Sequence, residues 1–237
     1  ILCLLYMVKH FEILHMTKKE ALPNKDMMKV LCGFGIPMGL QYSITAIGSI
    51  ILQAAVNGLG SMSVAAMTAA SRIGMFFCCP FDALGSTMAT YGGQNIGARK
   101  FHRIGEGLKA AVFMGSVYSF LALAVLFTFG NTIALLFLDS DQVQILSQVK
   151  QYLLITSSFF IPLVLVNVVR FLIQGMGYSK RAMFAGVCEM AARAAVGFLL
   201  VPRFGFLAAC FASPSAWIAA DLFDSLLPFD YEKVIQG

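Results

Sequence analysis

The chain has 237 residues, of which 59% are hydrophobic and only 12% charged, and its formal net charge is +5 at pH 7. Soluble domains are closer to half apolar and a quarter charged, and their helices carry a polar face. The composition and a mean hydropathy of +0.79 therefore exclude an ordinary soluble domain and indicate a protein that lies in a membrane.

The first part of the chain is too short to cross a bilayer. Residues 1–8 are apolar, but a membrane-spanning helix needs about 20 such residues. We expect them to be the end of a truncated preceding transmembrane helix. Residues 9–29 are polar, contain Pro23 and five lysines, and are expected to form a cytosolic linker. Residues 229–237 are expected to form a cytosolic tail.

Long uncharged stretches dominate the rest of the sequence. Lys, Arg, Asp and Glu are absent from residues 30–71, 110–138, 151–169 and 204–220. Together with the glycine, proline and charged residues between them, these stretches predict six membrane spans, at about 30–56, 62–94, 107–138, 149–175, 182–202 and 204–228. The predicted fold is an all-α integral membrane protein in which residues 30–228 form a lobe of six transmembrane helices.

The basic residues predict the orientation of the spans. If the linker is cytosolic, then 12 of the 17 lysines and arginines fall on the cytosolic side, in the linker, residues 97–109, Lys180 and Arg181, and the tail. The opposite side holds Lys150, Arg203 and an acidic loop with Asp139 and Asp141. Cytosolic loops are enriched in Lys and Arg, so we expect both ends of this multi-pass protein on the cytosolic side of the cell membrane.

The stretch YGGQNIGARKFHR, residues 91–103, has two interpretations. Its glycines and basic residues could cradle a phosphate, but such a loop follows a strand and carries a Lys-Ser/Thr pair. Here a long apolar helix precedes the glycines, and the pair is missing. The stretch therefore favours a cytosolic helix exit, in which Gly92, Gly93 and Gly97 permit close helix packing and end the helix.

These residues resemble a motif of the MATE (multidrug and toxic compound extrusion) transporters. The pattern is a proline in mid-span, a glycine five residues later and GGQNIGARK at the exit. The matching positions are Pro80, Gly85, Gly93, Gln94, Asn95, Gly97 and Ala98. The opening of the first span, Gly35-Ile36-Pro37, is also similar to the family, and the resemblance runs from about Met28 to Leu227.

The resemblance implies that the chain is the second six-helix lobe of a twelve-helix transporter. Its partners would be the missing N-terminal lobe, the lipid bilayer and a drug-like small molecule, and nucleic acid is not expected. Such transporters export cationic, often aromatic compounds in exchange for H⁺ or Na⁺, with no other cofactor, from a cavity between the lobes. Where some members carry acidic cation ligands, this sequence has Thr45 and Leu165.

Two charged residues near the middle of the fifth predicted span share one face. Glu189 and Arg193 are four residues apart, a spacing that makes them neighbours on a helix. Ionisable side chains inside a membrane are costly and tend to be paired and functional. Glu189 is a candidate for exchanging a proton or balancing a cationic drug, with Arg193 as its partner; a permanent structural salt bridge is the alternative.

Asp82 and Arg72 are the other candidates for ion or proton coupling. Pro80 leaves a backbone carbonyl without its helical donor, and this carbonyl could help to ligate Na⁺ near Asp82. Arg72 lies about 15 Å away along the helix axis, so we expect it to pair with a carboxylate of another helix. Arg170 is expected to reach the lipid headgroups from near its helix end.

Further polar residues could contact a substrate or simply join helices. On the first and fourth predicted spans these are Gln41, Tyr42, Thr45, Gln53, Asn167 and Gln174. Asp221 and Asp224, three residues apart near the end of the last span, could guide cations or be solvated carboxylates at a helix end. The six cysteines lack CxxC spacing and are expected to be structural thiols.

The sequence carries no catalytic or zinc-binding motif, so we expect a transporter and not an enzyme. The leading hypothesis is a secondary-active multidrug antiporter. One alternative is a flippase for lipid-linked saccharides, which should have a strongly cationic cavity, whereas the intramembrane charges here are mixed. Another alternative is a truncated membrane protein that does not transport.

Overall fold

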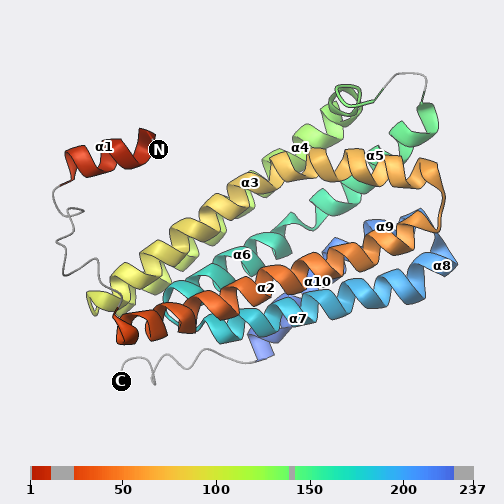
Figure 1. The fold of residues 1–237 in the computed structure, drawn as a ribbon. Coiled ribbons are helices and arrows are strands. Elements are labelled where there is room, and N and C mark those ends of the chain that lie inside the picture. The colour runs from red at the N-terminus through yellow and green to blue at the C-terminus, as the bar shows by residue number, and fades with distance from the viewer. Residues whose placement is uncertain (1, 12–23, 139–141, 227–237) are drawn as a thin grey trace.

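The computed structural model describes residues 2–11, 24–138 and 142–226, and all regular secondary structure within these ranges is helical (Figure 1). Most of the linker, the acidic loop 139–141 and the tail lie outside the described residues. The helices are α1 (Leu2–His10), α2 (Lys25–Asn57), α3 (Ser61–Gly97), α4 (Phe101–Ala134), α5 (Val143–Ser158), α6 (Phe160–Gly175), α7 (Ser179–Ala195), α8 (Val201–Phe204), α9 (Phe206–Cys210) and α10 (Ala212–Leu226).

The long helices follow the predicted spans. Among the described residues, α2, α3, α4 and the continuous stretch Ser179–Phe204 are each long and apolar enough to cross a membrane, and α5 with α6 makes a fifth span if the bent pair is counted as one. The sixth predicted span corresponds to the short helices α9 and α10. The prediction of an all-helical membrane fold is confirmed.

Two of the spans are irregular, which the sequence analysis did not predict. The axis bends by 54° between α5 and α6, at Phe159 and shortly before Pro162, whose ring cannot continue a regular hydrogen-bond ladder. In the fifth span a π-helical turn, Val196–Leu200, separates α7 from α8. Such turns often occur at functional sites, and this one begins three residues after Arg193.

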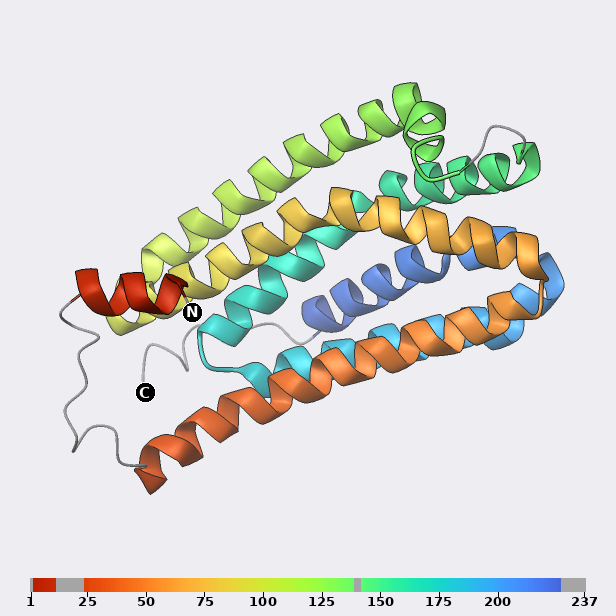
Figure 2. The ribbon, with the colours of Figure 1, turned by 45° about the horizontal axis from the view of Figure 1, so that its top comes forward.

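The helices form a bundle in which α2 and α3 diverge from each other (Figure 2). α7 packs between α2 and α10, and α6 packs between α10 and α3, while α4 and α5 cover the outer side of α3. α2 and α3 meet at their connection, residues 58–60, and diverge from there toward the other end of the bundle (Figure 2). Gly60 turns this connection with a φ of 100°, which a residue with a side chain rarely adopts.

Glycines let α3 and α6 approach closely, as predicted for the GGQNIG stretch. A Cβ on Gly92 would lie 2.6 Å from the Leu172 side chain, and a Cβ on Gly93 would lie 3.1 Å from the carbonyl oxygen of Gly175. Gly97 is the last residue of α3. The expectation of close packing is confirmed for Gly92 and Gly93, whereas nothing lies within 4 Å of a Cβ on Gly97, which only marks the end of the helix.

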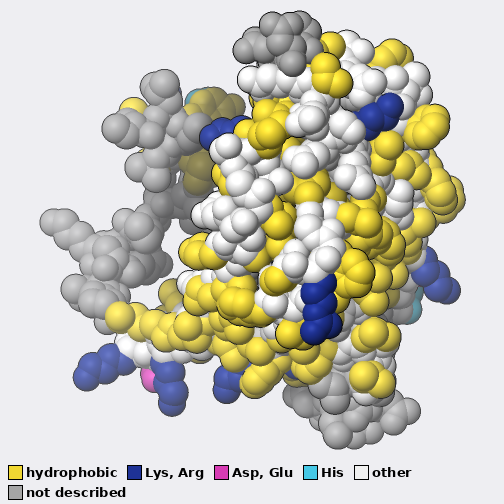
Figure 3. Space-filling view, turned by 90° about the vertical axis from the view of Figure 1, so that its right-hand side faces the viewer, with side chains coloured by type: hydrophobic (Ala, Val, Ile, Leu, Met, Phe, Trp, Pro, Cys, Tyr) yellow, Lys and Arg dark blue, Asp and Glu magenta, His cyan; other side chains and the backbone are white. Residues whose placement is uncertain are grey.

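The outer surface is largely apolar, as expected for helices that face lipid. The space-filling view has mostly hydrophobic side chains with isolated lysines and arginines between them (Figure 3). The exposed apolar residues include Phe76, Phe113 and Phe127, each at least 70% exposed. The cysteines whose side chains are described form no disulfide; Cys210 is buried, whereas Cys32 and Cys79 are exposed.

Tyr118 of α4 forms a hydrogen bond to α3 close to Pro80. Pro80 lacks the N–H that would bond the carbonyl one turn earlier, and the Tyr118 hydroxyl donates to the neighbouring carbonyl of Phe77 at 3.2 Å. The Tyr118 ring also packs edge-to-face on Phe81 at 5.0 Å. The hydroxyl therefore joins α4 to α3 within one turn of Pro80.

Substituting Tyr118→Phe should lower the free energy of unfolding by about 1 kcal/mol, because one hydrogen bond is lost and the ring packing stays. Thermal unfolding of the purified protein measures the change. Tyr6→Phe is the matched control, since the Tyr6 hydroxyl makes no hydrogen bond within the described residues. Equal melting temperatures for the two variants would contradict this role of Tyr118.

Candidate functional site

A cavity of about 340 Å³ occupies the interior of the bundle. Helices α2, α3, α6, α7 and α10 all contribute to its wall. The lining residues are Gln41, Tyr42, Thr45, Asp82, Ser86, Leu163, Val166, Asn167, Arg170, Phe171, Glu189, Arg193 and Trp217. The structure thus brings together seven of the ten residues that the sequence analysis singled out for coupling and substrate binding.

Three buried charged side chains form a cluster in the cavity wall. Glu189 is 2% exposed, and its Oε1 accepts a hydrogen bond from the NH2 group of Arg170. Its Oε2 lies 3.5 Å from NH1 of Arg193. Glu189 and Arg193 share one face of α7, as predicted, but the hydrogen-bonded partner of Glu189 is on a different helix.

The expectation that Arg170 reaches the lipid headgroups is wrong. Arg170 is only 6% exposed, and its guanidinium points into the bundle, where the carboxylate of Glu189 compensates its charge. Pairing with a carboxylate inside the bundle avoids the cost of placing a free charge in hydrocarbon, so the side chain turns inward.

Asp82 lines the cavity from α3. Its Oδ1 accepts a hydrogen bond from Nδ2 of Asn167 on α6 at 3.2 Å. Asp82 is exposed in the described chain and forms no ion pair with an arginine there. Ser86 lies one turn along the same face of α3, and its hydroxyl donates to the carbonyl of Asp82 at 2.9 Å.

Five of the six uncharged polar candidates lie at the cavity or bond a residue that lines it. The cavity is lined by Gln41, Tyr42, Thr45 and Asn167. Gln174 does not line the cavity itself but donates a hydrogen bond to Oε1 of Gln41. Gly186 makes room for this arrangement, because a Cβ there would lie 3.1 Å from Cγ of Gln41.

Arg72 and Gln53 lie elsewhere. Gln53 bonds Asn57 of its own helix at 3.1 Å. Arg72 is exposed on α3 and makes no salt bridge within the described residues.

A pattern in the sequence could have identified Arg170. Asn167, Arg170 and Gln174 are spaced by three and four residues and therefore form one polar stripe on α6. A stripe of this kind in a membrane helix faces the bundle interior. Trp217 and Phe171 carry no such signal, because single aromatic residues occur throughout the apolar runs.

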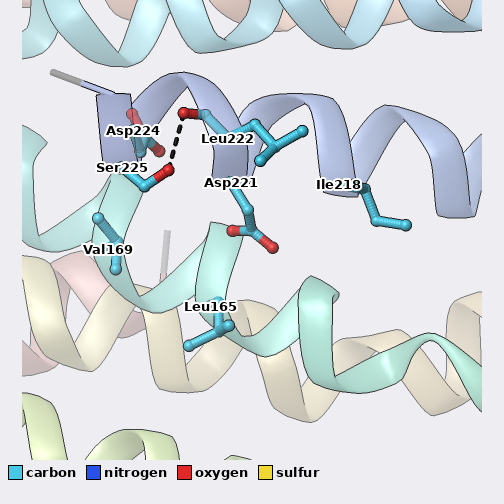
Figure 4. A pocket seen from close by; sticks show the side chains of 7 residues that line it. All are labelled: Leu165, Val169, Ile218, Asp221, Leu222, Asp224 and Ser225. Atoms are coloured by element: carbon cyan, nitrogen blue, oxygen red, sulfur yellow. Dashed lines mark hydrogen bonds between the residues drawn. The ribbon is translucent and has the colours of Figure 1, made fainter.

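A second groove lies between α6 and α10 and has a volume of about 400 Å³. It is lined by Leu165, Val169, Ile218, Asp221, Leu222, Asp224 and Ser225 (Figure 4). Asp221 and Asp224 are half-buried and interact electrostatically with Arg170. They are therefore not fully solvated carboxylates at a helix end. Leu165 lies in this groove and not in the central cavity.

The arrangement can hold charge but shows no catalytic geometry. The central cavity offers two arginines, two carboxylates and several neutral polar groups on apolar walls that include Trp217 and Phe171. Within the described residues, no three His, Cys, Asp or Glu side chains lie close enough together to hold a metal ion. Such a cavity suits the binding of a small amphiphilic molecule or a monovalent ion.

Comparisons with known proteins give a consistent result. The family model MatE matches residues 37–199, which is more than half of the chain. The probable multidrug resistance protein YoeA of Bacillus subtilis is 21% identical over 119 residues, which are 50% of this chain and 26% of that protein.

Solved structures of MATE transporters share the fold. MATE in complex with MaL6 superposes with a TM-score of 0.83 at 16% identity, over 100% of this chain and 54% of that one. A multidrug resistance MATE family transporter of the MOP superfamily in an outward-facing conformation gives 0.76 at 19% identity, over 87% and 46%. A MOP superfamily transporter of Pyrococcus furiosus gives 0.75 at 20% identity, over 86% and 45%.

The chain therefore spans about half the length of the solved structures it matches. Because the family model covers most of the six-helix region, the chain belongs to the MatE family, whose members are membrane transporters and not enzymes.

Proposed function

We propose that this chain forms the second lobe of a secondary-active multidrug exporter, which exchanges amphiphilic, cationic compounds for H⁺ or Na⁺. The observation that carries the proposal is the central cavity, which combines ionisable and polar side chains with aromatic walls and is open to the surface at the exposed residues Tyr42 of α2 and Asp82 of α3. A first lobe of the same transporter would cover this opening, with both ends of the chain on the cytosolic side of the cell membrane. The largely exposed apolar surface of α2 supports such a partner.

Asp82 and the cluster around Glu189 would have different roles in transport. Asp82 is the carboxylate in the cavity wall that has no arginine partner within the described residues, so it is available to a substrate cation or to Na⁺. Glu189, held by Arg170 and Arg193, is the candidate for proton exchange, because opening the cluster would release its carboxylate. Exchange follows if ion and substrate cannot bind together; Na⁺ and the substrate cation would compete directly for Asp82.

Substituting Asp82→Asn should lower ion-driven export roughly tenfold, since the amide keeps the shape of the side chain but loses the charge that holds a cation. The measurement is uptake of ethidium into proteoliposomes that contain the full-length transporter, with an imposed H⁺ or Na⁺ gradient. Asp26→Asn, which removes an exposed carboxylate at the start of α2 outside the cavity, is the matched control and should transport normally.

Two outcomes would contradict the proposal at different levels. If the wild-type transporter moved no amphiphilic cation under either gradient, the proposed function would fail. If it transported ethidium and Asp82→Asn did so equally well, the exporter would stand and the role of Asp82 would fall.

A further inference from the structure

Arg193 of α7 packs against α2. It is 7% exposed and lines the central cavity. On the side of α2, a Cβ at Gly48 would lie 3.5 Å from Cδ of Arg193, so the aliphatic part of the arginine packs against the backbone of α2. The side chain is thereby fixed between α2 and α7, with its guanidinium at the cavity wall.

The two arginines of the cavity differ in how much negative charge surrounds them. Arg170 bonds Glu189 directly and also interacts with Asp221 and Asp224 from α10. Arg193 shares only Glu189, at 3.5 Å, and its NH1 group has no hydrogen-bond partner within the described residues. The two arginines share the one carboxylate of Glu189, so the cluster of three side chains keeps an excess positive charge, and the donor on NH1 of Arg193 is unfilled.

A buried guanidinium with an unfilled donor favours the binding of a hydrogen-bond acceptor. Leaving a buried charged donor unsatisfied costs more than leaving a neutral one unsatisfied, and the cost is removed when an acceptor arrives. The planar fork of an arginine fits the two oxygens of a carboxylate or a phosphate better than it fits any other common group. Cations gain nothing from Arg193, whereas an acidic group gains both charge and hydrogen bonds.

The cavity is therefore bipolar. The carboxylate of Asp82 enters it from α3, and the guanidinium of Arg193 enters it from α7. No ion pair joins these two side chains in the described part of the chain. They remain available to opposite ends of one bound molecule.

We propose that Arg193 anchors an acidic group of the substrate, so that the preferred substrates are zwitterionic amphiphiles whose cation lies at Asp82 and whose carboxylate or similar oxyanion lies at Arg193. This inference rests on the proposed function and specifies its substrate class. It also assigns Arg193 a role in substrate recognition beside its contact with Glu189.

Binding of two related dyes tests the assignment without requiring transport. Rhodamine B carries a delocalised cation and a carboxylate, and in rhodamine B ethyl ester the carboxylate is capped. Fluorescence anisotropy of each dye, titrated with the purified full-length transporter, gives the two dissociation constants. We expect rhodamine B to bind about tenfold more tightly than the ester, because only its carboxylate can bond Arg193.

Variants of Arg193 separate recognition from structure. Arg193→Gln should reduce the preference to about twofold or less while the ester still binds within about threefold of its wild-type affinity. Arg193→Lys should retain part of the preference, since its charge remains without the fork. Arg203→Gln, which removes an exposed arginine of α8, should leave both affinities unchanged.

The inference is overturned by equal binding of the two dyes to the wild type, by a preference that survives in Arg193→Gln, or by loss of both dyes in that variant. Failure of the proposed function looks different: the preference for rhodamine B would be present and depend on Arg193, yet neither dye would be exported under an ion gradient.

Discussion

Replacing Arg170 by glutamine is expected to destabilise the protein by about 3–5 kcal/mol, because the substitution leaves Glu189 buried without its hydrogen-bonded partner. Arg193 cannot fully replace that partner, since its NH1 lies 3.5 Å from the other carboxylate oxygen and has no hydrogen-bond partner within the described residues. The same change removes the positive charge that interacts electrostatically with Asp221 and Asp224. Ion-driven export by the full-length transporter should be lost with it.

Thermal unfolding of the purified transporter, followed by circular dichroism, measures the effect. A loss of this size should lower the melting temperature by roughly 10 °C. The double variant Arg170→Gln, Glu189→Gln should regain part of that loss, because the uncompensated carboxylate is gone. Arg203→Gln is the matched control. If Arg170→Gln melted like Arg203→Gln, the buried pair would not exist in the folded protein.

The fold could be predicted because a membrane imposes a simple rule on sequence. Helices that cross hydrocarbon must be apolar over about 20 residues, and the charge-free stretches of this chain have that length. The bend between α5 and α6 and the π-helical turn after Arg193 were not predicted. Both keep an apolar composition, and the local backbone geometry depends on packing against neighbouring helices, which the sequence pattern does not encode.

The candidate site was predictable in composition but not in its pairing. Glu189 and Arg193 were identified because charge is rare inside a membrane span, and their shared face follows from their spacing. That Glu189 bonds Arg170 depends on how α6 and α7 pack, and distance from the helix end suggested the opposite orientation for Arg170. Gln53 was a candidate because it is a polar residue in an apolar span. Its side chain bonds Asn57 of the same helix and does not line the cavity.

The position of α6 against α3 determines whether Arg170 and Asn167 reach the cavity at all, and Gly175 controls that position. A Cβ at Gly175 would lie 2.0 Å from the carbonyl oxygen of Ala89 and 2.6 Å from its Cα. Both are backbone atoms of α3, so no side chain can move aside to relieve the clash. The two helices would have to separate at the end of α6. At glycines whose neighbours are only side chains, the neighbouring side chain could move instead.

Substituting Gly175→Ala should therefore cost about 3 kcal/mol or more, at the upper end of what overpacking costs, and should reduce export because Asn167 shifts relative to Asp82. Gly93→Ala, whose Cβ would lie 3.1 Å from the Gly175 carbonyl oxygen, should have a smaller effect. Gly130→Ala on α4 is the matched control, because nothing lies within 4 Å of its Cβ. Melting temperatures in the order Gly130→Ala, Gly93→Ala, Gly175→Ala, from highest to lowest, would support this crossing; the same temperature for all three would mean that α3 and α6 do not meet through their backbones.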